Sequence, residues 1–215
     1  MKEFLGWWFP DYESHFPKML QKNVTRGGQP VYQEPVRKRS IALCQQRRTA
    51  IDVGANVGLW SRDLCENFQT VIAFEPVEDF RNCLTKNVLS EKLDVRSVAL
   101  GNVATRATMN ITEGNTGHSH IDPASFGQGE TEVILLDSLN LNNIDYIKVD
   151  CEGFEYRVLQ GAEQTIKRNR PVVVVEQKPH DAYADQYGQH EAIALLQSWG
   201  MRKLDQVKDD WIMGW

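Results

Sequence analysis

The 215-residue sequence has no long hydrophobic run. Its longest aliphatic stretches, such as Val172 to Val175, are only a few residues long, whereas about 20 apolar residues are needed to cross a bilayer. Residues 1–14 contain a short apolar run that Pro10 and Asp11 interrupt, and they lack the apolar core and the cleavage site of a secretory signal. We therefore expect a cytoplasmic protein without a membrane partner.

The sequence also lacks paired cysteines and an excess of positive charge. Its four cysteines lie far apart, with no C-x-x-C pair and no Cys/His spacing typical of zinc, so we expect reduced thiols. The 24 basic residues are outnumbered by 29 acidic residues, which gives a formal net charge of −5. This balance argues against general affinity for nucleic acid or anionic membranes, although it is compatible with a local basic groove.

What the sequence does contain is the composition of a folded globular domain, with 41% apolar and 25% charged residues. From about residue 49, short apolar runs alternate with stretches of helical periodicity. Strands are predicted over 49–54, 71–74 and 95–100, and the apolar residues between them recur at the three- and four-residue spacing of helices. This βαβαβ order predicts a parallel sheet with right-handed crossovers.

The same alternation is found in the second half of the chain. The predicted elements there are strand 144–149, a helical stripe over 158–166, strand 171–176, a helix over 192–199 and a closing antiparallel hairpin over 201–215. Strand 171–176 is so uniformly apolar that both faces of the sheet must be covered at this point.

Two segments fall outside the alternation. Residues 113–130 form a predicted loop between strands 107–112 and 132–136, and a loop of this length in a compact domain is usually functional or disordered. Residues 1–48 contain a cluster of aromatic side chains. We interpret this segment as a helical, aromatic cap that packs on the helices of the sheet, with a substrate cover or an oligomer contact as the alternative. One compact domain is expected, made of this cap and of residues 49–215.

The stretch IDVGANVG (51–58) is the most informative part of the sequence. Gly54 directly follows a strand, where a tight turn and the close approach of a ligand need glycine. Asn56 is predicted to cap the next helix, and Gly58 to lie in its first turn, where a side chain would collide with the strand. Asp52 lies at the end of the buried strand, where a carboxylate needs a hydrogen-bond partner.

Glu75 ends the next strand, 21 residues after Gly54, where a carboxylate can accept both hydroxyls of a ribose. A dinucleotide would require a glycine at the position of Asn56, and Asp52 would repel its phosphates. S-adenosyl-methionine suits the turn better, because it carries an ammonium, a sulfonium and free ribose hydroxyls. A nicotinamide-dependent oxidoreductase is the weaker alternative, since no Tyr-x-x-x-Lys pair accompanies the turn.

Six blocks of the sequence stand in the order and spacing of a known family: IDVGANVGLWS (51–61), VIAFEPVEDFRNCLTKNV (71–88), VALGN (98–102), LDSL (136–139), IDYIKVDCEGFEYRVLQGA (144–162) and RPVVVVEQK (170–178). In these blocks the chain resembles the FkbM-type S-adenosyl-methionine-dependent methyltransferases. The resemblance implies that residues 49–215 are a class I methyltransferase domain, with a Rossmann-like, mostly parallel seven-stranded sheet, helices on both faces and an antiparallel last strand.

The resemblance also implies S-adenosyl-methionine as the cofactor and O-methyl transfer to a small hydroxylated acceptor, such as a sugar or a metabolite. The cofactor contacts expected from it are Asp52, Gly54, Ala55, Asn56, Gly58, Glu75, Pro76, Ala99 and Leu100. The acceptor itself and the oligomeric state, with a dimer as one option, stay open.

Methyl transfer from a sulfonium is a direct displacement, so the enzyme has to position the acceptor oxygen and remove its proton. Asp150 and Glu152 follow one predicted strand and Glu176 ends the next, which places all three candidates at the carboxyl rim of the sheet. For Glu152 the alternative is a carboxylate that merely stabilises a helix N-terminus. We expect the acidic residues of this rim to face the cationic sulfonium.

Within the long loop, His118 and His120 supply imidazoles, the side chains best suited to accept a proton near neutral pH. We expect one of them to act as the general base. A divalent metal held together with the acidic rim is an alternative, but His-x-His on a loop is a weak metal signal, so no metal ligands are predicted. A non-catalytic methyltransferase-fold binding module is the third reading, and a partner nucleic acid is not expected.

Overall fold

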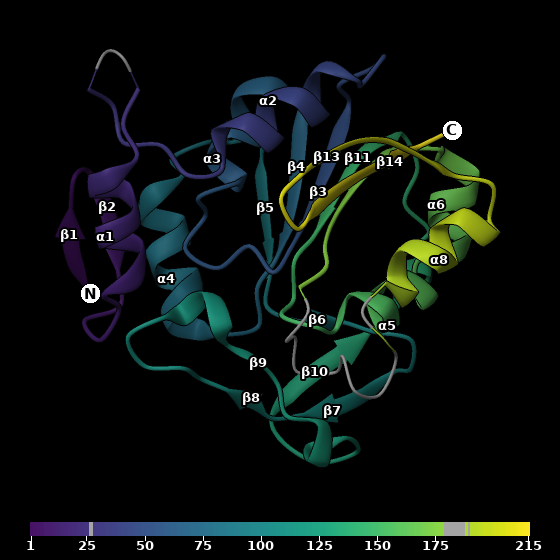
Figure 1. Ribbon diagram of the computed structural model, residues 1–215. Helices are drawn as coiled ribbons and strands as arrows, with labels where there is room; N and C mark the ends of the chain where they lie inside the picture. The colour runs from purple at the N-terminus through teal and green to yellow at the C-terminus, as the bar shows by residue number, and fades with distance from the viewer. Residues whose placement is uncertain (26–27, 179–187, 189) are drawn as a thin grey trace.

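The computed structural model describes residues 1–25, 28–178, 188 and 190–215. At its centre is a seven-stranded sheet (Figure 1). In spatial order its strands are β13 (Arg202–Val207), β14 (Asp210–Gly214), β12 (Val172–Glu176), β11 (Ile144–Val149), β3 (Thr49–Val53), β4 (Thr70–Phe74) and β5 (Leu93–Arg96). Neighbours from β12 to β5 are parallel, and β14 runs antiparallel to both of its neighbours. The predicted fold class is confirmed.

Helices cover both faces of this sheet, as the uniformly apolar β12 requires. Because side chains alternate along a strand, Val173 and Val175 pack on one side and Val172 and Val174 on the other. The first side is covered by α5 (Glu155–Gln160), α6 (Glu163–Asn169) and α8 (Glu191–Ser198), and the second by α2 (Glu34–Ala42), α3 (Ser61–Asn67) and α4 (Glu78–Asn87).

Two predicted elements are divided in the structure. The helical stripe over 158–166 is split into α5 and α6, because the chain turns at Gly161, where an added Cβ would lie 1.9 Å from the backbone oxygen of Gly101. The strand predicted over 95–100 ends at Arg96, and the chain then enters β6 (Ala99–Leu100). Neither break can be predicted from the apolar residues. The close backbone contact at Gly161 and the passage of the chain from one sheet to another do not alter the pattern of apolar residues in the sequence.

Strand β6 belongs to a second, three-stranded sheet. It pairs with β10 (Thr131–Ile134), which in turn pairs with β7 (Thr105–Ala107). The predicted loop 113–130 contains η1 (Thr116–His118), β9 (His120–Ile121) and η2 (Pro123–Ser125), and β9 pairs with β8 (Met109–Asn110). η3 (Leu136–Leu139) then leads to β11. The long loop is therefore a structured excursion below the carboxyl ends of the central strands (Figure 1).

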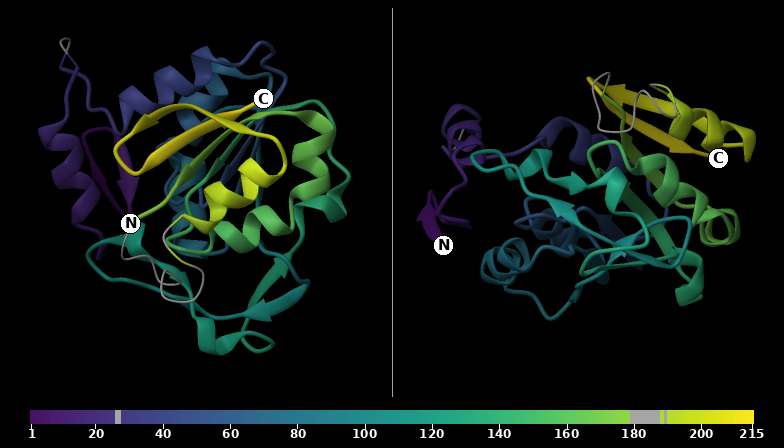
Figure 2. Two further views of the ribbon diagram at one scale, coloured as in Figure 1. Left: turned by 45° about the vertical axis from the view of Figure 1, so that its right-hand side comes forward. Right: turned by 90° about the horizontal axis from the view of Figure 1, so that it is seen from below.

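The N-terminal segment forms a hairpin of β1 (Lys2–Phe4) and β2 (Trp7–Phe9), followed by α1 (His15–Lys22). It stands at the opposite side of the molecule from α8 and the C-terminal hairpin (Figure 2). Asn87 of α4 fixes the hairpin, since its Oδ1 accepts the Trp8 N–H at 2.6 Å and its Nδ2 donates to the Trp8 oxygen at 2.9 Å. None of the helices in the described parts of the chain has the length and apolar character needed to cross a membrane.

Gly54 brings the ends of β3 and β11 into contact. It has a φ of +74°, and its N–H, like that of Ala55, donates to the Phe74 oxygen at 3.1 Å. A Cβ at Gly54 would lie 2.0 Å from the backbone oxygen of Asp150. Both the backbone conformation and the packing thus require glycine at this turn.

We therefore predict that Gly54→Ala destabilises the protein far more than Gly6→Ala. Gly6 has a φ of +75° but no atom within 4 Å of an added Cβ, so its substitution carries only the left-handed strain of about 1–2 kcal/mol. Gly54→Ala adds an overpacking cost of about 1–3 kcal/mol. Urea denaturation measures both free energies of unfolding, and equal losses would contradict the packing argument.

Candidate active site

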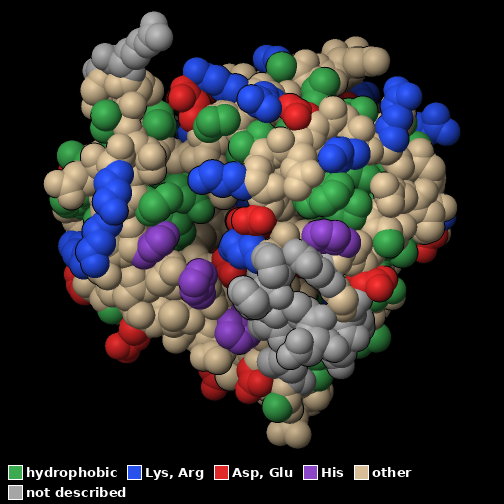
Figure 3. All heavy atoms as spheres, viewed as in Figure 1, with side chains coloured by type: hydrophobic (Ala, Val, Ile, Leu, Met, Phe, Trp, Pro, Cys, Tyr) green, Lys and Arg blue, Asp and Glu red, His purple; other side chains and the backbone are tan. Residues whose placement is uncertain are grey.

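A cavity of about 890 Å³, its mouth included, lies at the carboxyl ends of β3, β4, β11 and β12. Its walls come from the turn after β3, the end of β4, the loop after β11, the end of β12, segment 116–121 and two aromatic residues of the N-terminal segment, Phe16 and Tyr32. On the face seen in Figure 3, histidines and a mixed group of acidic and basic side chains surround a hollow. Parallel strands bring their carboxyl ends to one edge, which is where such folds bind ligands.

The turn after β3 differs from the predicted helix start. Asn56 has a φ of +50° and does not cap a helix, because α3 begins only at Ser61. Its Oδ1 accepts the N–H of Val57 at 2.9 Å, while its Nδ2 donates to the Thr116 oxygen at 3.0 Å. Gly58 lies in the turn before α3, and a Cβ there would meet Val88 at 2.9 Å rather than the strand.

Glu75 is a buried carboxylate on the cavity wall. Its Oε2 accepts the Asn56 N–H and its Oε1 accepts the Val77 N–H, both at 2.8 Å. Burial raises the pKa of Glu75 to about 7, even though these hydrogen bonds, Arg81 and Lys148 pull it down. Each oxygen accepts one backbone N–H, which leaves it a lone pair for a ligand.

Asp52 does not line the cavity and is fully buried beneath the turn. Its Oδ2 accepts the Ser61 hydroxyl at 2.6 Å, and its Oδ1 lies 3.5 Å from Lys148 Nζ. Lys148 Nζ also donates to the Gly54 oxygen at 3.0 Å and lies 3.4 Å from Asp150 Oδ2. Burial alone would lower the pKa of Lys148, but Asp150 and Asp52 outweigh it and raise the pKa.

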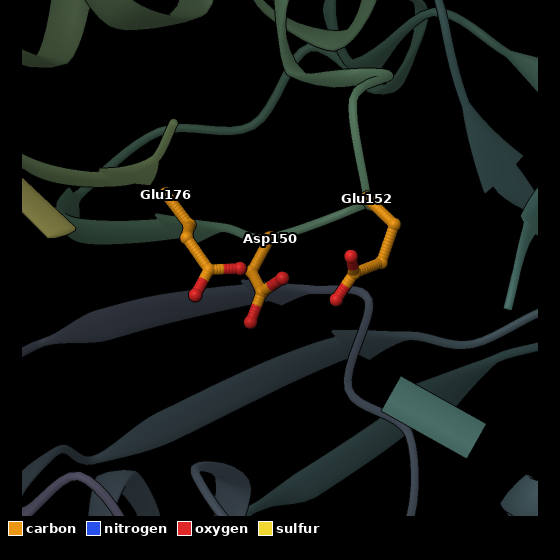
Figure 4. A group of neighbouring side chains, drawn as sticks. All are labelled: Asp150, Glu152 and Glu176. Atoms are coloured by element: carbon orange, nitrogen blue, oxygen red, sulfur yellow. The ribbon is translucent and has the colours of Figure 1, made fainter. Parts of the chain in front are cut away.

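Three carboxylates, those of Asp150, Glu152 and Glu176, are turned toward one another at the rim of the cavity (Figure 4). One oxygen from each lies within 4.8 Å of the others, so among the described residues this group has the spacing to ligate a metal ion. Lys178 Nζ already bridges two of them, at 2.9 Å from Glu152 Oε1 and 2.5 Å from Glu176 Oε2. The cluster therefore carries its own counter-charge.

The two adjacent carboxyls of this cluster titrate differently. Burial and the charge of Asp150 raise the pKa of Glu176. Burial also disfavours the ionised Asp150, but Lys148 and Lys178 outweigh it and lower the pKa of Asp150. Of the two, Glu176 is therefore the carboxyl that is protonated more easily.

Glu152 does not cap α5. Its φ is +52°, and its carboxylate pairs with Lys178. The carboxylate at the start of α5 is instead that of Glu155, whose Oε1 accepts the N–H groups of Cys151 at 2.6 Å and Gly153 at 3.2 Å. The left-handed backbone of Glu152 turns the chain at the cavity rim.

The two histidines lie in different surroundings. His120 lines the cavity, and its Nδ1 is 2.9 Å from the backbone oxygen of His118. Because a carbonyl can only accept, Nδ1 carries the proton and Nε2 is left as the basic nitrogen of the neutral ring. His118 is exposed and is not among the lining residues of the cavity.

The other predicted contacts divide in the same way. Gly58 is not among the residues that line the cavity. The predicted contacts that do line it are Gly54, Ala55, Asn56, Glu75, Pro76, Ala99, Leu100, Asp150, Glu152 and Glu176. Sequence reasoning missed Phe16, Tyr32 and Thr116 as wall residues. The aromatic cluster was the available signal for Phe16, which lines the cavity and also belongs to the apolar packing around α1.

Comparison with known proteins shows which family this domain belongs to. The family described as the methyltransferase FkbM domain matches residues 52–203. The chain belongs to this family. It therefore contains an S-adenosyl-methionine-dependent methyltransferase domain, and the predicted resemblance is confirmed.

Solved structures agree with the fold. The FkbM methyltransferase of Methylobacillus flagellatus KT is 17% identical, with a TM-score of 0.50, and the match covers 79% of this chain and 44% of that one. This chain thus spans less than half the length of that FkbM protein. A Klebsiella pneumoniae protein provisionally described as an O-methyltransferase is 13% identical, with a TM-score of 0.54 and coverage of 93% and 88%. Comparison with curated proteins gave no match.

We predict that Lys148→Met destabilises this FkbM domain by about 3–5 kcal/mol, because it leaves the buried Asp52 without a counter-charge. Lys38→Met is the matched control. Lys38 is 74% exposed, and within the described part of the chain its one ion pair is with Glu34 on its own helix, so the expected loss is below about 1 kcal/mol. Urea denaturation measures both variants. Adding Asp52→Asn should restore part of the loss, and a Lys148→Met loss no larger than that of the control would contradict the buried ion pair.

Proposed function

We propose that the protein is an S-adenosyl-methionine-dependent O-methyltransferase that methylates a hydroxyl of a small acceptor, such as a sugar or a metabolite. The observation that carries this proposal is the position of Glu75, whose buried carboxylate is held by two backbone N–H groups on the wall of the cavity. A carboxylate fixed in this way is suited to accept the two hydroxyls of a ribose. Family membership supports the same cofactor.

The residues around Glu75 fit the rest of the cofactor. Pro76, Ala99 and Leu100 offer an apolar wall for an adenine, and the turn from Gly54 to Asn56 allows close approach of a ligand. Asp150 and Glu152 line the same cavity, where their carboxylates favour a cation. We assign Asp52 and Gly58 to the support of the turn. When bound, S-adenosyl-methionine supplies a methyl group that is activated by a sulfonium.

The acceptor hydroxyl requires a base, and His120 is the candidate that the geometry favours. Its Nδ1–H is engaged by the backbone of His118, which leaves Nε2 to take the proton. Asp150 and Glu176 also line the cavity, where the ionised Asp150 can accept a hydrogen bond from an acceptor hydroxyl. These groups orient a neutral polyhydroxylated molecule better than an anionic one.

The cofactor assignment predicts that S-adenosyl-homocysteine binds below millimolar concentration and that NADH does not, as isothermal titration calorimetry measures. Glu75→Gln should weaken binding about 10–100-fold, which is the loss of affinity expected when one or two hydrogen bonds to a charged group are removed. Glu78→Gln, an exposed residue three positions on, is the control. Since the pKa of Glu75 is about 7 and the ionised form binds, affinity should fall about tenfold from pH 8 to pH 6 in the wild type and in Glu78→Gln, but not in Glu75→Gln. Binding of NADH instead would overturn the proposal.

The base assignment predicts that His120→Ala lowers methyl transfer at least about 100-fold and leaves the affinity for S-adenosyl-homocysteine unchanged. Turnover is measured as S-adenosyl-homocysteine release with a panel of sugars and hydroxylated metabolites. His118→Ala tests the other histidine and should keep most of the activity. Wild-type turnover of the double variant would exclude both residues as the base, and cofactor binding without turnover on any acceptor would favour a binding module.

A further inference from the structure

The N-terminal segment contains a buried carboxylate outside the cavity, that of Glu13, with 0% exposure. None of the ion pairs formed by the described residues includes it. Its Oε1 accepts the N–H groups of His15 and, at 2.9 Å, Phe16, at the start of α1. Its Oε2 accepts the N–H of Thr116 at 2.6 Å, although Thr116 lies 103 residues further along the chain. Burial of this charge is costly unless donors surround it, so these contacts determine its position.

A second set of hydrogen bonds joins the same two segments. The backbone oxygen of Gly114 accepts the N–H groups of Ser14 at 3.1 Å and His15 at 3.0 Å, and the Ser14 hydroxyl at 3.1 Å. The start of α1 and residues 114–116 are therefore held together by both backbone and side-chain bonds.

Thr116 carries this connection to the turn after β3. Its backbone oxygen accepts the Asn56 Nδ2 at 3.0 Å, and its hydroxyl donates to the Asn56 Oδ1 at 3.3 Å. The Asn56 N–H in turn donates to Glu75 Oε2 at 2.8 Å. An unbroken series of hydrogen bonds thus links Glu13, through Thr116 and Asn56, to the carboxylate proposed to hold the cofactor.

We propose that Glu13 is a positioning residue for cofactor binding, which acts by fixing Thr116 on Asn56 and thereby the Asn56 N–H on Glu75. Asn56 has a left-handed backbone, and the two hydrogen bonds with Thr116 fix its side chain while its N–H is directed at Glu75. The inference gives residues 1–48 a part in the cavity, where Phe16 and Tyr32 already form a wall. It rests on the proposed function.

The test is the affinity for S-adenosyl-homocysteine, measured by calorimetry on the full chain. Glu13→Gln keeps the size of the side chain but puts an amide group among N–H donors, and it should weaken binding about tenfold. Glu3→Gln is the matched control, because Glu3 is exposed on β1 of the same segment, and it should bind like the wild type. An unchanged affinity of Glu13→Gln would overturn the inference.

A double-variant cycle separates positioning from general stability. Asn56→Gly keeps the positive φ and removes the amide that holds Thr116. If Glu13 acts through Asn56, Glu13→Gln should cost about tenfold in the wild type and less than about twofold in the Asn56→Gly protein. A purely structural role predicts the same factor in both backgrounds, and that result would overturn the connection.

Thr116→Val covers the case in which Glu13→Gln does not fold. It removes only the hydroxyl that donates to Asn56 and keeps the backbone N–H that donates to Glu13. We expect a several-fold loss of affinity for S-adenosyl-homocysteine, with an unchanged far-UV circular dichroism spectrum. Wild-type affinity in Thr116→Val would contradict the inference. A wild-type protein that does not bind S-adenosyl-homocysteine would overturn the proposed function, whereas normal wild-type binding with unaffected variants would overturn only the role of Glu13.

Discussion

The geometry of the cavity depends on one buried ammonium, that of Lys148. It lies between the carboxylates of Asp52 and Asp150 and donates to the backbone oxygen of Gly54. The central strand β3, its neighbour β11 and the glycine turn are thus tied together at a single atom. Removing such a charge from water is costly, and only the full set of partners compensates for it. The turn and the carboxylate rim therefore keep their relative positions only while this group is in place.

This arrangement also divides the acidic residues into two kinds. Asp52 is a fully buried support with no part in the cavity wall, while Asp150 faces the cavity and shares the same lysine. Asp52 and Asp150 therefore have different roles, although each is an aspartate near the carboxyl end of a buried, apolar strand. The distinction comes from position along the strands: Asp52 lies inside β3 in register with Lys148, whereas Asp150 lies on the same face but past the end of β11, where it reaches the cavity.

Much of the fold could be predicted from the sequence, because β12 and the glycine turn carry local signals: an uninterrupted apolar run and a glycine that backbone geometry requires. The left-handed Asn56 could not be predicted, since its conformation depends on Thr116, 60 residues away. The break between β5 and β6 and the role of Glu155 at α5 also depend on tertiary contacts. Phe16 and Tyr32 could not be identified as wall residues, because an aromatic side chain in a wall and one in a core look alike in sequence.

The negative charge of the chain is not concentrated in the cavity as the sequence suggested. Lys148 and Lys178 face the three rim carboxylates and offset most of their charge. A cation is therefore favoured by the placement of individual carboxylates rather than by a general negative field. Such a rim has little net charge with which to recruit a charged acceptor. Its fixed carboxylate oxygens accept hydrogen bonds instead, which suits the neutral hydroxylated acceptor proposed above.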